Sequence, residues 1–446
     1  FGVYNDKSHG IGENSQQQGA LMTAGGASSI VAQTGNISAQ GLKLISEQNA
    51  QLQAGKDIRL TTAVEHINTD ESSTKRAVGA AKVSDTERFF GYHRELSSKQ
   101  QGQTVHSGSL ISSLDGDVKV NAGGEYQQTS SELLAKNKIS VDAASIKTDT
   151  VFNEQSLKSH ESDLKIGNFT RVKSPIIDLI NTIESTVKNK DASDRVKAAN
   201  LMSIAAQGYN ALELAKEVDI SNWSKNPTDA GYLLRIETGT GFSHHRDNRE
   251  GWEKISQANR MNAKDIELNA HSGKLDLTHT DLTSRDKTGQ RLADSHISLY
   301  GRDGIDYQAG LDLGQYKGRQ QNSGVEVGTA VSVGAKTGWS FYLQLGFGQG
   351  KQDSEFQTVR NSQIDTERLS LKTGDSTKSS PQADAHLRGV TAKARVIETD
   401  IQGDLTVESL QSHAKSKNTS SGLNLQVEGG FGSAWGASAG AQAAKG

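Results

Sequence analysis

The chain has 446 residues and a formal net charge of −3, so no strong electrostatic attraction to nucleic acid or anionic lipid is expected. Only 33% of the residues are hydrophobic and 5% are aromatic, which is too polar for one large compact core. Cysteine is absent, which excludes disulfides, thiolate metal sites and cysteine nucleophiles. The chain opens without a signal peptide, and we expect Phe1 to mark a cut within a larger protein.

A short pattern recurs along the chain: a turn residue, then a strand whose apolar residues alternate with polar ones. It is seen at 55–60 (Gly-Lys-Asp-Ile-Arg-Leu), and again at 116–120, 137–141, 264–268, 273–277 and 403–407. The interval is 21 residues from Ile37 to Ile58, 21 from Val118 to Ile139, and 22 from Leu275 to Ile297. A fixed period of short strands predicts an all-β solenoid, a parallel β-helix whose rungs of about 21 residues stack on one another.

The repeats predict one β-helix region over 1–446, in which four coil-forming blocks alternate with four excursions. The blocks cover about 20–62, 108–150, 262–310 and 364–411, each about two periods long. The excursions cover about 63–107, 151–261, 311–363 and 412–446. We expect the apolar strand residues of the blocks to form one continuous core, made of Ile37, Ile58, Val118, Ile139, Ile266, Leu275, Ile297, Leu299, Leu405 and Val407.

The excursions are predicted to be antiparallel β-hairpins, because apolar and polar residues alternate along them. The first, 63–107, is charged and the least regular. The second alternates over 164–172 and 234–242, and the period between them becomes helical, which predicts a helical hairpin over 174–217 with Ser174 as N-cap and Pro175 in the first turn. The fourth alternates from Leu423 and then becomes rich in glycine, alanine and serine.

The third excursion has the strongest alternation and is the candidate contact site. Its apolar face is predicted to contain Val325, Val327, Val331, Val333, Trp339, Phe341, Leu343, Leu345 and Phe347. One interpretation is that this face packs on the solenoid flank or on another excursion; the other is that it seeks a membrane or a partner. In water it should be covered, by the chain or by a second molecule. Since open strand edges cannot lie in hydrocarbon, insertion would require several excursions or chains to close one sheet.

Motifs for catalysis are not found. No P-loop, G-x-S-x-G or H-E-x-x-H pattern occurs, and the acidic residues of the strands alternate with apolar ones as a solvated face does. His244, His245, His271 and His279 with Asp281 lack the close spacing of a metal site, so we interpret them as scattered surface histidines. We therefore expect no enzyme activity, no cofactor and no metal; a carbohydrate-acting β-helix enzyme would need carboxylates assembled across rungs.

The coil pattern resembles the hemagglutinin repeats of large bacterial exoproteins secreted by the two-partner route. The excursions, with Val-Lys-Ser-Pro-Ile-Ile-Asp at 172–178 and Gln-Gly-Tyr-Asn-Ala at 207–211, resemble the second, distal repeat region of contact-dependent growth inhibition effectors. The resemblance implies a right-handed β-helix, exported through an outer-membrane transporter and displayed on the bacterial surface. It also implies a part in moving a C-terminal toxin across the outer membrane of a neighbouring bacterium. The alternative is an adhesin shaft, a spacer or a surface that adheres to other bacteria or host cells.

Overall fold

The structure, a computed structural model, describes residues 2–82, 87–173, 234–333, 338–375, 383–432 and 436–445. Every regular element within these ranges is a β-strand, as the all-β prediction requires. The described residues include no helix long and apolar enough to cross a bilayer. The strands form three sheets, two parallel and one antiparallel. The helical hairpin predicted over 174–217 lies outside the described residues.

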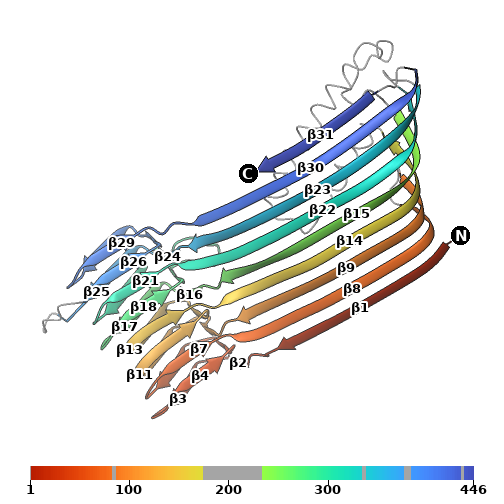
Figure 1. Ribbon diagram of the computed structural model, residues 1–446. Coiled ribbons are helices and arrows are strands. Elements are labelled where there is room, and N and C mark those ends of the chain that lie inside the picture. Colours follow the sequence, from red (N-terminus) through yellow and green to blue (C-terminus); the bar gives the residue numbers. More distant parts are fainter. Residues whose placement is uncertain are drawn as a thin grey trace.

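The two parallel sheets, here called the layer sheets, consist of short strands stacked layer on layer (Figure 1). In the described ranges, the smaller has eight strands: β2 (Leu21–Ala24), β5 (Lys43–Ser46), β10 (Leu110–Ser113), β12 (Glu132–Ala135), β16 (Asn259–Asn262), β19 (Thr280–Thr283), β24 (Ser362–Asp365) and β27 (Val390–Lys393). The larger has fourteen: β3 (Ser28–Ala32), β4 (Ile37–Gln40), β6 (Ala50–Ala54), β7 (Ile58–Thr61), β11 (Val118–Thr129), β13 (Lys138–Asp149), β17 (Asp265–Ala270), β18 (Leu275–Thr278), β20 (His296–Gly301), β21 (Ile305–Gln308), β25 (Arg368–Thr373), β26 (Ala385–Arg388), β28 (Val396–Asp400) and β29 (Leu405–Glu408). Stacked parallel strands of this kind are consistent with a β-helix.

The 21-residue period is confirmed at two places, because Ile37 pairs with Ile58 and Val118 with Ile139 in parallel register. The third expected pairing is wrong: Leu275 lies beside Ile305, and Ile297 lies beside Ile266. The reason is an extra turn after β19, held by a bridge between Arg285 and Arg291, which lengthens this layer. Inserted residues at a corner shift the spacing in sequence without disturbing the ladder.

The core lies between the layer sheets and is a single cluster of buried apolar side chains. Eight of the ten predicted core residues belong to it: Ile37, Ile58, Val118, Ile139, Ile266, Leu275, Ile297 and Leu299. The prediction is wrong for Leu405 and Val407, which are 45% and 68% exposed. Both lie on β29, which pairs with β26 on one side and is the last strand of its ladder, so no further layer covers them.

The third sheet, here called the long-strand sheet, is antiparallel and is built from the hairpins. In the described residues its nine strands are, in spatial order, β1 (Gly2–Gln16), β8 (Ala63–Lys82), β9 (Glu87–Ser107), β14 (Phe152–Lys173), β15 (Leu234–Ser256), β22 (Gly310–Val333), β23 (Gly338–Arg360), β30 (His413–Gly432) and β31 (Gly436–Lys445). Spatial order equals sequence order, so each hairpin pairs edge to edge with the next (Figure 1). The first hairpin, expected to be the least regular, pairs without a break from Ala63 to Lys82.

The hairpins line up because they leave the layers at the same corner. Just beyond their bases, buried polar residues connect successive layers: the Ser109 N–H donates to Ser131 Oγ, and the Ser131 N–H donates to Asn259 Oδ1. In the eight-stranded sheet the order is β5, β10, β12, β16, β19, β24, so two layers separate one hairpin from the next. The long-strand sheet likewise gains two strands at each hairpin.

Each long strand bends near the end that lies farther from the layers (Figure 1). Gly91 and Gly167 face each other there across the β9–β14 seam. A Cβ added to Gly91 would meet the Ile166 carbonyl oxygen and approach Gly167 Cα to 2.6 Å. Glycine at both positions therefore permits the two backbones to approach closely where the sheet curves.

Candidate functional site

The predicted contact residues of the third hairpin lie on one face of the long-strand sheet, here called the outer face. Val331 pairs with Trp339, Val327 with Leu343 and Val325 with Leu345, so alternate positions of β22 and β23 share this side. Seven of the nine are exposed: Val325, Val327, Val331, Trp339, Phe341, Leu343 and Phe347. Leu345 is half-buried, and the side chain of Val333 lies outside what the structure describes.

The expectation that this apolar face packs on the solenoid flank or on another excursion is wrong, because most of its side chains are exposed. Phe341 is 57% exposed, whereas its neighbour Tyr342, which points to the opposite side, is 2% exposed. The hairpin therefore places its polar and small side chains inward and its large apolar ones outward. The reason lies in the pairing, because β22 and β23 are held by strand neighbours on both edges instead of by packing of their apolar face.

The outer face continues onto neighbouring hairpins, which the sequence alone did not reveal. Ile236 lies beside Val331, Phe242 lies beside Val325, and Val427 lies beside Leu343. Further exposed apolar side chains on this face are Val78, Phe90, Ile166 and Leu423. The apolar character is strongest from β14 to β30, since on β9 the arginines Arg88 and Arg94 share this face.

The opposite or inner face carries a buried ionic network around Arg171 on β14. Its guanidinium lies 3.2 Å from Glu87 of β9, 3.4 Å from Glu237 of β15 and 3.0 Å from Glu326 of β22. Burial alone lowers the pKa of Arg171, but Glu326 and Glu87 outweigh this effect and raise the pKa. One arginine therefore connects four strands that belong to three different hairpins.

A second arginine extends this network toward the C-terminal hairpin. Arg235 Nε lies 2.7 Å from Glu237 Oε1, and Arg235 Nη1 lies 2.8 Å from Glu428 Oε1. Arg235 is on β15 and Glu428 is on β30, so this ion pair spans β22 and β23. The Arg235 side chain can extend over β22 and β23 because the residues beneath it, Ala330 and Ser340, are small. Along this row the inner face therefore carries small residues, whereas the outer face carries large apolar ones.

Aromatic side chains of the inner face pack beside the arginines. Arg171 lies over the ring of Phe169 at 4.7 Å, and Arg235 lies over the ring of Tyr342 at 5.6 Å. Phe169 also belongs to a small buried cluster with Phe89, Ala330 and Tyr342. Burial raises the pKa of Tyr342, and the charge of Glu237 raises it further, so its hydroxyl remains neutral.

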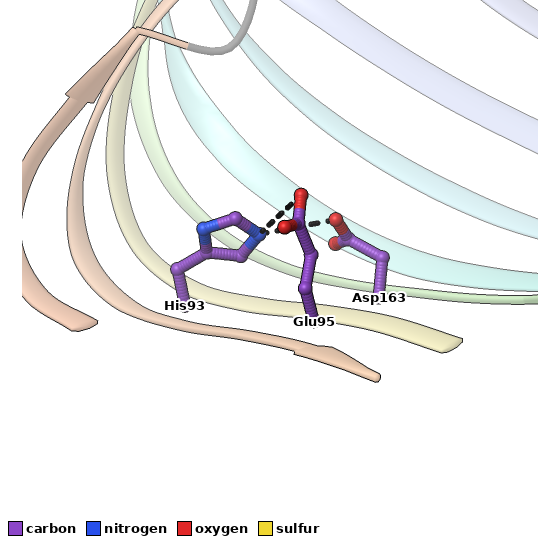
Figure 2. A group of neighbouring side chains, drawn as sticks. All are labelled: His93, Glu95 and Asp163. Carbon is purple, nitrogen blue, oxygen red and sulfur yellow. Dashed lines mark hydrogen bonds and ion pairs between the residues drawn. The ribbon is translucent and has the colours of Figure 1, made fainter. Parts of the chain in front are cut away.

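A third feature of the inner face is the group His93, Glu95 and Asp163, whose side chains point toward one another (Figure 2). His93 Nε2 lies 3.1 Å from Asp163 Oδ2 and 3.8 Å from Glu95 Oε1. The alternation of His93 and Glu95 on one strand was visible in the sequence, but Asp163 joins them only through the register of β14 with β9. No pattern in the sequence fixes that register.

The histidines singled out from the sequence are not brought together. His244 contacts Ser162, His245 contacts Asn322, His271 contacts Ser272 and His279 contacts Ser256. None of them belongs to a group of three potential metal ligands within the described ranges. The prediction of a surface position is wrong for His279, which is buried, with its Nδ1 2.6 Å from Ser256 Oγ. Burial lowers the pKa of this histidine.

Comparison with known proteins identifies the family. The family model described as hemagglutinin repeat matches residues 2–162 and 240–425, which is most of the chain. The chain belongs to the hemagglutinin-repeat family. The matched ranges include strands of the layer sheets and of the long-strand sheet alike, so the hemagglutinin-repeat pattern covers both parts of the architecture.

Three hemagglutinin-repeat relatives illustrate the range of matches. The tRNA nuclease CdiA of Yersinia mollaretii is 21% identical over 92% of this chain and 13% of its own length. The Toxin CdiA of Yersinia pestis is 20% identical over 92% of this chain and 12% of its own length. The Deoxyribonuclease CdiA of Yersinia pseudotuberculosis is 20% identical over 91% of this chain and 37% of its own length. The chain therefore spans from about an eighth to somewhat more than a third of the length of these relatives, and the activities in their names belong to the whole proteins.

No solved structure matches the chain. Membership in the hemagglutinin-repeat family and similarity to CdiA proteins nevertheless place it among the secreted, cell-surface exoproteins of two-partner secretion. This agrees with the prediction from the sequence.

Proposed function

We propose that this chain is a non-catalytic segment of a secreted exoprotein and that it engages the outer membrane of a neighbouring bacterium to help deliver a C-terminal toxin. The single observation that carries the proposal is the two-sided character of the long-strand sheet. Its outer face exposes large apolar side chains, while its inner face buries arginines and glutamates. This distribution is the one expected of strands that face lipid on one side and a polar environment on the other.

The dimensions of the third hairpin support this role. The apolar positions run over nine residues on each arm, 325–333 and 339–347, which is close to the ~9–11 residues of a strand that crosses a bilayer. A contiguous apolar surface of this kind is unfavourable in water, and contact with lipid removes it from water. The sheet edges set a limit, because the unpaired backbone groups of β1 and β31 need partners before the sheet can lie in hydrocarbon. We propose that several excursions or chains rearrange together and supply hydrogen-bond partners for these edge strands.

The remaining parts of the proposal concern architecture and partners. We infer that the stacked layers form a right-handed parallel β-helix that stays outside the membrane, divided into the four coil blocks and four excursions defined above. We also propose that residues 174–217, which lie outside the described residues, form the helical insert expected in the second excursion. The partners are an outer-membrane two-partner transporter during export and, after export, the outer membrane of a neighbouring cell or a host-cell surface. The similarity to CdiA proteins over most of the chain supports this assignment.

The test is liposome flotation with outer-membrane lipids, combined with a toxin-delivery assay in the full exoprotein. The variant Phe341→Asp/Leu343→Asp places two carboxylates on the outer face, and a charge on the lipid side of a membrane strand costs up to about 2–4 kcal/mol at the bilayer midplane. We expect it to lose flotation and delivery while secretion is unchanged. The matched control is Gln349→Asp/Gln352→Asp, which adds the same charge at exposed polar positions of β23 and should float and deliver as the unmodified protein does.

The alternative function is an adhesin shaft, in which the layers are a spacer and the hairpins are decoration. If Phe341→Asp/Leu343→Asp delivers toxin at the unmodified rate, the membrane proposal fails and the shaft replaces it. Deletion of the hairpin 325–347 provides a second comparison in the flotation assay.

A further inference from the structure

The group His93, Glu95 and Asp163 lies at the seam between the first and second hairpins. His93 and Glu95 are two residues apart on β9, so their side chains share the inner face. Asp163 of β14 is directly opposite Glu95, across a seam of eighteen paired positions. The backbone ladder therefore presents one imidazole and two carboxylates from two different hairpins at one point (Figure 2).

The distances suit a small metal ion. Three ligand atoms, one from each residue, lie within 4.8 Å of one another, and the separations from His93 Nε2 are 3.1 Å and 3.8 Å. Around a tetrahedral ion with bonds of about 2.1 Å, ligand atoms lie roughly 3.4 Å apart. The side chains need only small rotations to reach this arrangement.

A lysine lies near the other oxygen of each carboxylate, at ion-pair distance. Lys75 Nζ lies 3.6 Å from Glu95 Oε2, and Lys165 Nζ lies 3.7 Å from Asp163 Oδ1. The oxygens nearer the imidazole are Glu95 Oε1 and Asp163 Oδ2. The lysines therefore leave one oxygen of each carboxylate available to an ion.

We propose that His93, Glu95 and Asp163 bind one divalent transition-metal ion of the Zn²⁺ type. One imidazole nitrogen with two carboxylate oxygens suits this class, whereas Ca²⁺ prefers six to eight oxygens and Mg²⁺ keeps most of its waters. A fourth position is left for water. The ion joins β9 to β14, so it binds only when the first two hairpins are paired, and it stabilises the long-strand sheet by binding that state alone.

The competing explanation is a polar network, in which His93 contacts the two carboxylates without a metal. Isothermal titration of the full chain, stripped with EDTA, with ZnCl₂ separates the two. We expect one site per chain, which excess MgCl₂ does not displace. His93→Gln should weaken this site at least a hundredfold and Asp163→Asn at least tenfold. The matched control is His271→Gln, which removes an exposed histidine lying 3.8 Å from the single carboxylate of Asp142 and should leave the site unchanged.

Two further readouts keep the test independent of folding defects. Zn²⁺ should raise the unfolding temperature of the unmodified chain and of His271→Gln, but not of Glu95→Gln, whose circular dichroism without metal should match. Co²⁺ in place of Zn²⁺ should give the visible absorption of a tetrahedral site, and His93→Gln should abolish it. If the unmodified chain binds no Zn²⁺ at micromolar concentration, or if binding survives both His93→Gln and Asp163→Asn, the cluster is a polar network and the proposal fails. Neither result bears on the membrane proposal, which rests on the outer face.

Discussion

Ile58 and Val407 are both apolar positions of the repeated strand pattern, but their surroundings differ. Ile58 is completely buried, with layers on both sides of its strand, whereas Val407 lies on the last strand of the ladder and is 68% exposed. Ile58→Asp should lower the free energy of unfolding by several kcal/mol, because it buries an unpaired charge. Val407→Asp should change it by less than about 0.5 kcal/mol. Urea denaturation followed by circular dichroism measures both, and equal losses would contradict this account of the core.

Asp365 stabilises the extra turn that follows β19 and lengthens this layer. Its buried carboxylate accepts hydrogen bonds from Arg285 and Arg291, the latter at 2.6 Å. Burial alone raises the pKa of Asp365, but the two arginines outweigh burial and hold the pKa below its usual value. A carboxylate whose pKa is lowered by folding stabilises the protein above its unfolded pKa, about 3.9, and this stability is lost as the pH falls through the folded value.

The variant Asp365→Asn should therefore be less stable than the unmodified chain at pH 7, with the difference shrinking below about pH 4. Thermal unfolding between pH 3 and pH 7 provides the measurement. A difference in unfolding temperature that stays constant over this pH range would mean that ionisation of Asp365 does not stabilise the fold. Asp115, an exposed carboxylate paired with Lys136, serves as a control, since Asp115→Asn should have a small effect at any pH.

At the scale of elements, Arg171 determines how firmly the bent ends of the hairpins stay together. It links Glu87, Glu237 and Glu326, which come from three other strands. Arg171→Met keeps much of the side-chain volume but leaves buried carboxylates without this partner, which should cost about 2 kcal/mol after allowance for partial exposure.

Hydrogen exchange provides the measurement, because amides of β14 and β15 near Arg171 should exchange faster while those of the layer sheets do not. The control Lys351→Met removes an exposed lysine that contacts Asp353 on its own strand, and it should leave the exchange pattern as it was. Unchanged exchange in Arg171→Met would show that backbone pairing alone holds the seam.

Individual elements could be predicted from the sequence, but their partners could not. Alternation identified the hairpins, and the 21-residue period identified Ile58 and Val118 as core, because both are local properties of the chain. The pairing of Leu275 with Ile305 escaped prediction, since a corner turn of any length fits between two layers. The meeting of Asp163 with His93 and the continuity of the outer face also escaped it. Both depend on the register between hairpins, which no local pattern encodes.

At the scale of the whole molecule, the layers and the long strands have matching repeats. Adjacent strands lie about 4.8 Å apart in any sheet, so two layers raise the chain by about 9.6 Å, the width of one two-stranded hairpin. Two strands of the eight-stranded sheet separate successive hairpins, and each hairpin adds two strands to the long-strand sheet. This equality explains why the hairpins meet edge to edge without a gap.

Deleting residues 130–150, which contain β12 and β13, should break this match while the remaining layers still stack. The second hairpin would then lie one strand spacing too close to the first, and the β9–β14 seam should open. Because the chain has no cysteine, engineered disulfides can report on the seam. Ser97→Cys with Glu161→Cys, which are direct partners across it, should cross-link in the full chain and fail to do so after the deletion.

The control pair Ser159→Cys with Arg249→Cys lies within the second hairpin and should cross-link in both chains. Efficient cross-linking of Ser97→Cys with Glu161→Cys after the deletion would show that the hairpins do not depend on the number of layers between them.

The match between two layers and one hairpin also bears on how such a gene can change. Recombination that duplicates or removes a whole unit keeps every later hairpin beside its neighbour, because coil and sheet grow by the same height. A crossover that adds half a unit leaves a hairpin without its neighbour and exposes two strand edges, which promote aggregation. Selection on these proteins should therefore favour changes in length by complete units, so that lineages differ in reach by discrete steps of about 10 Å.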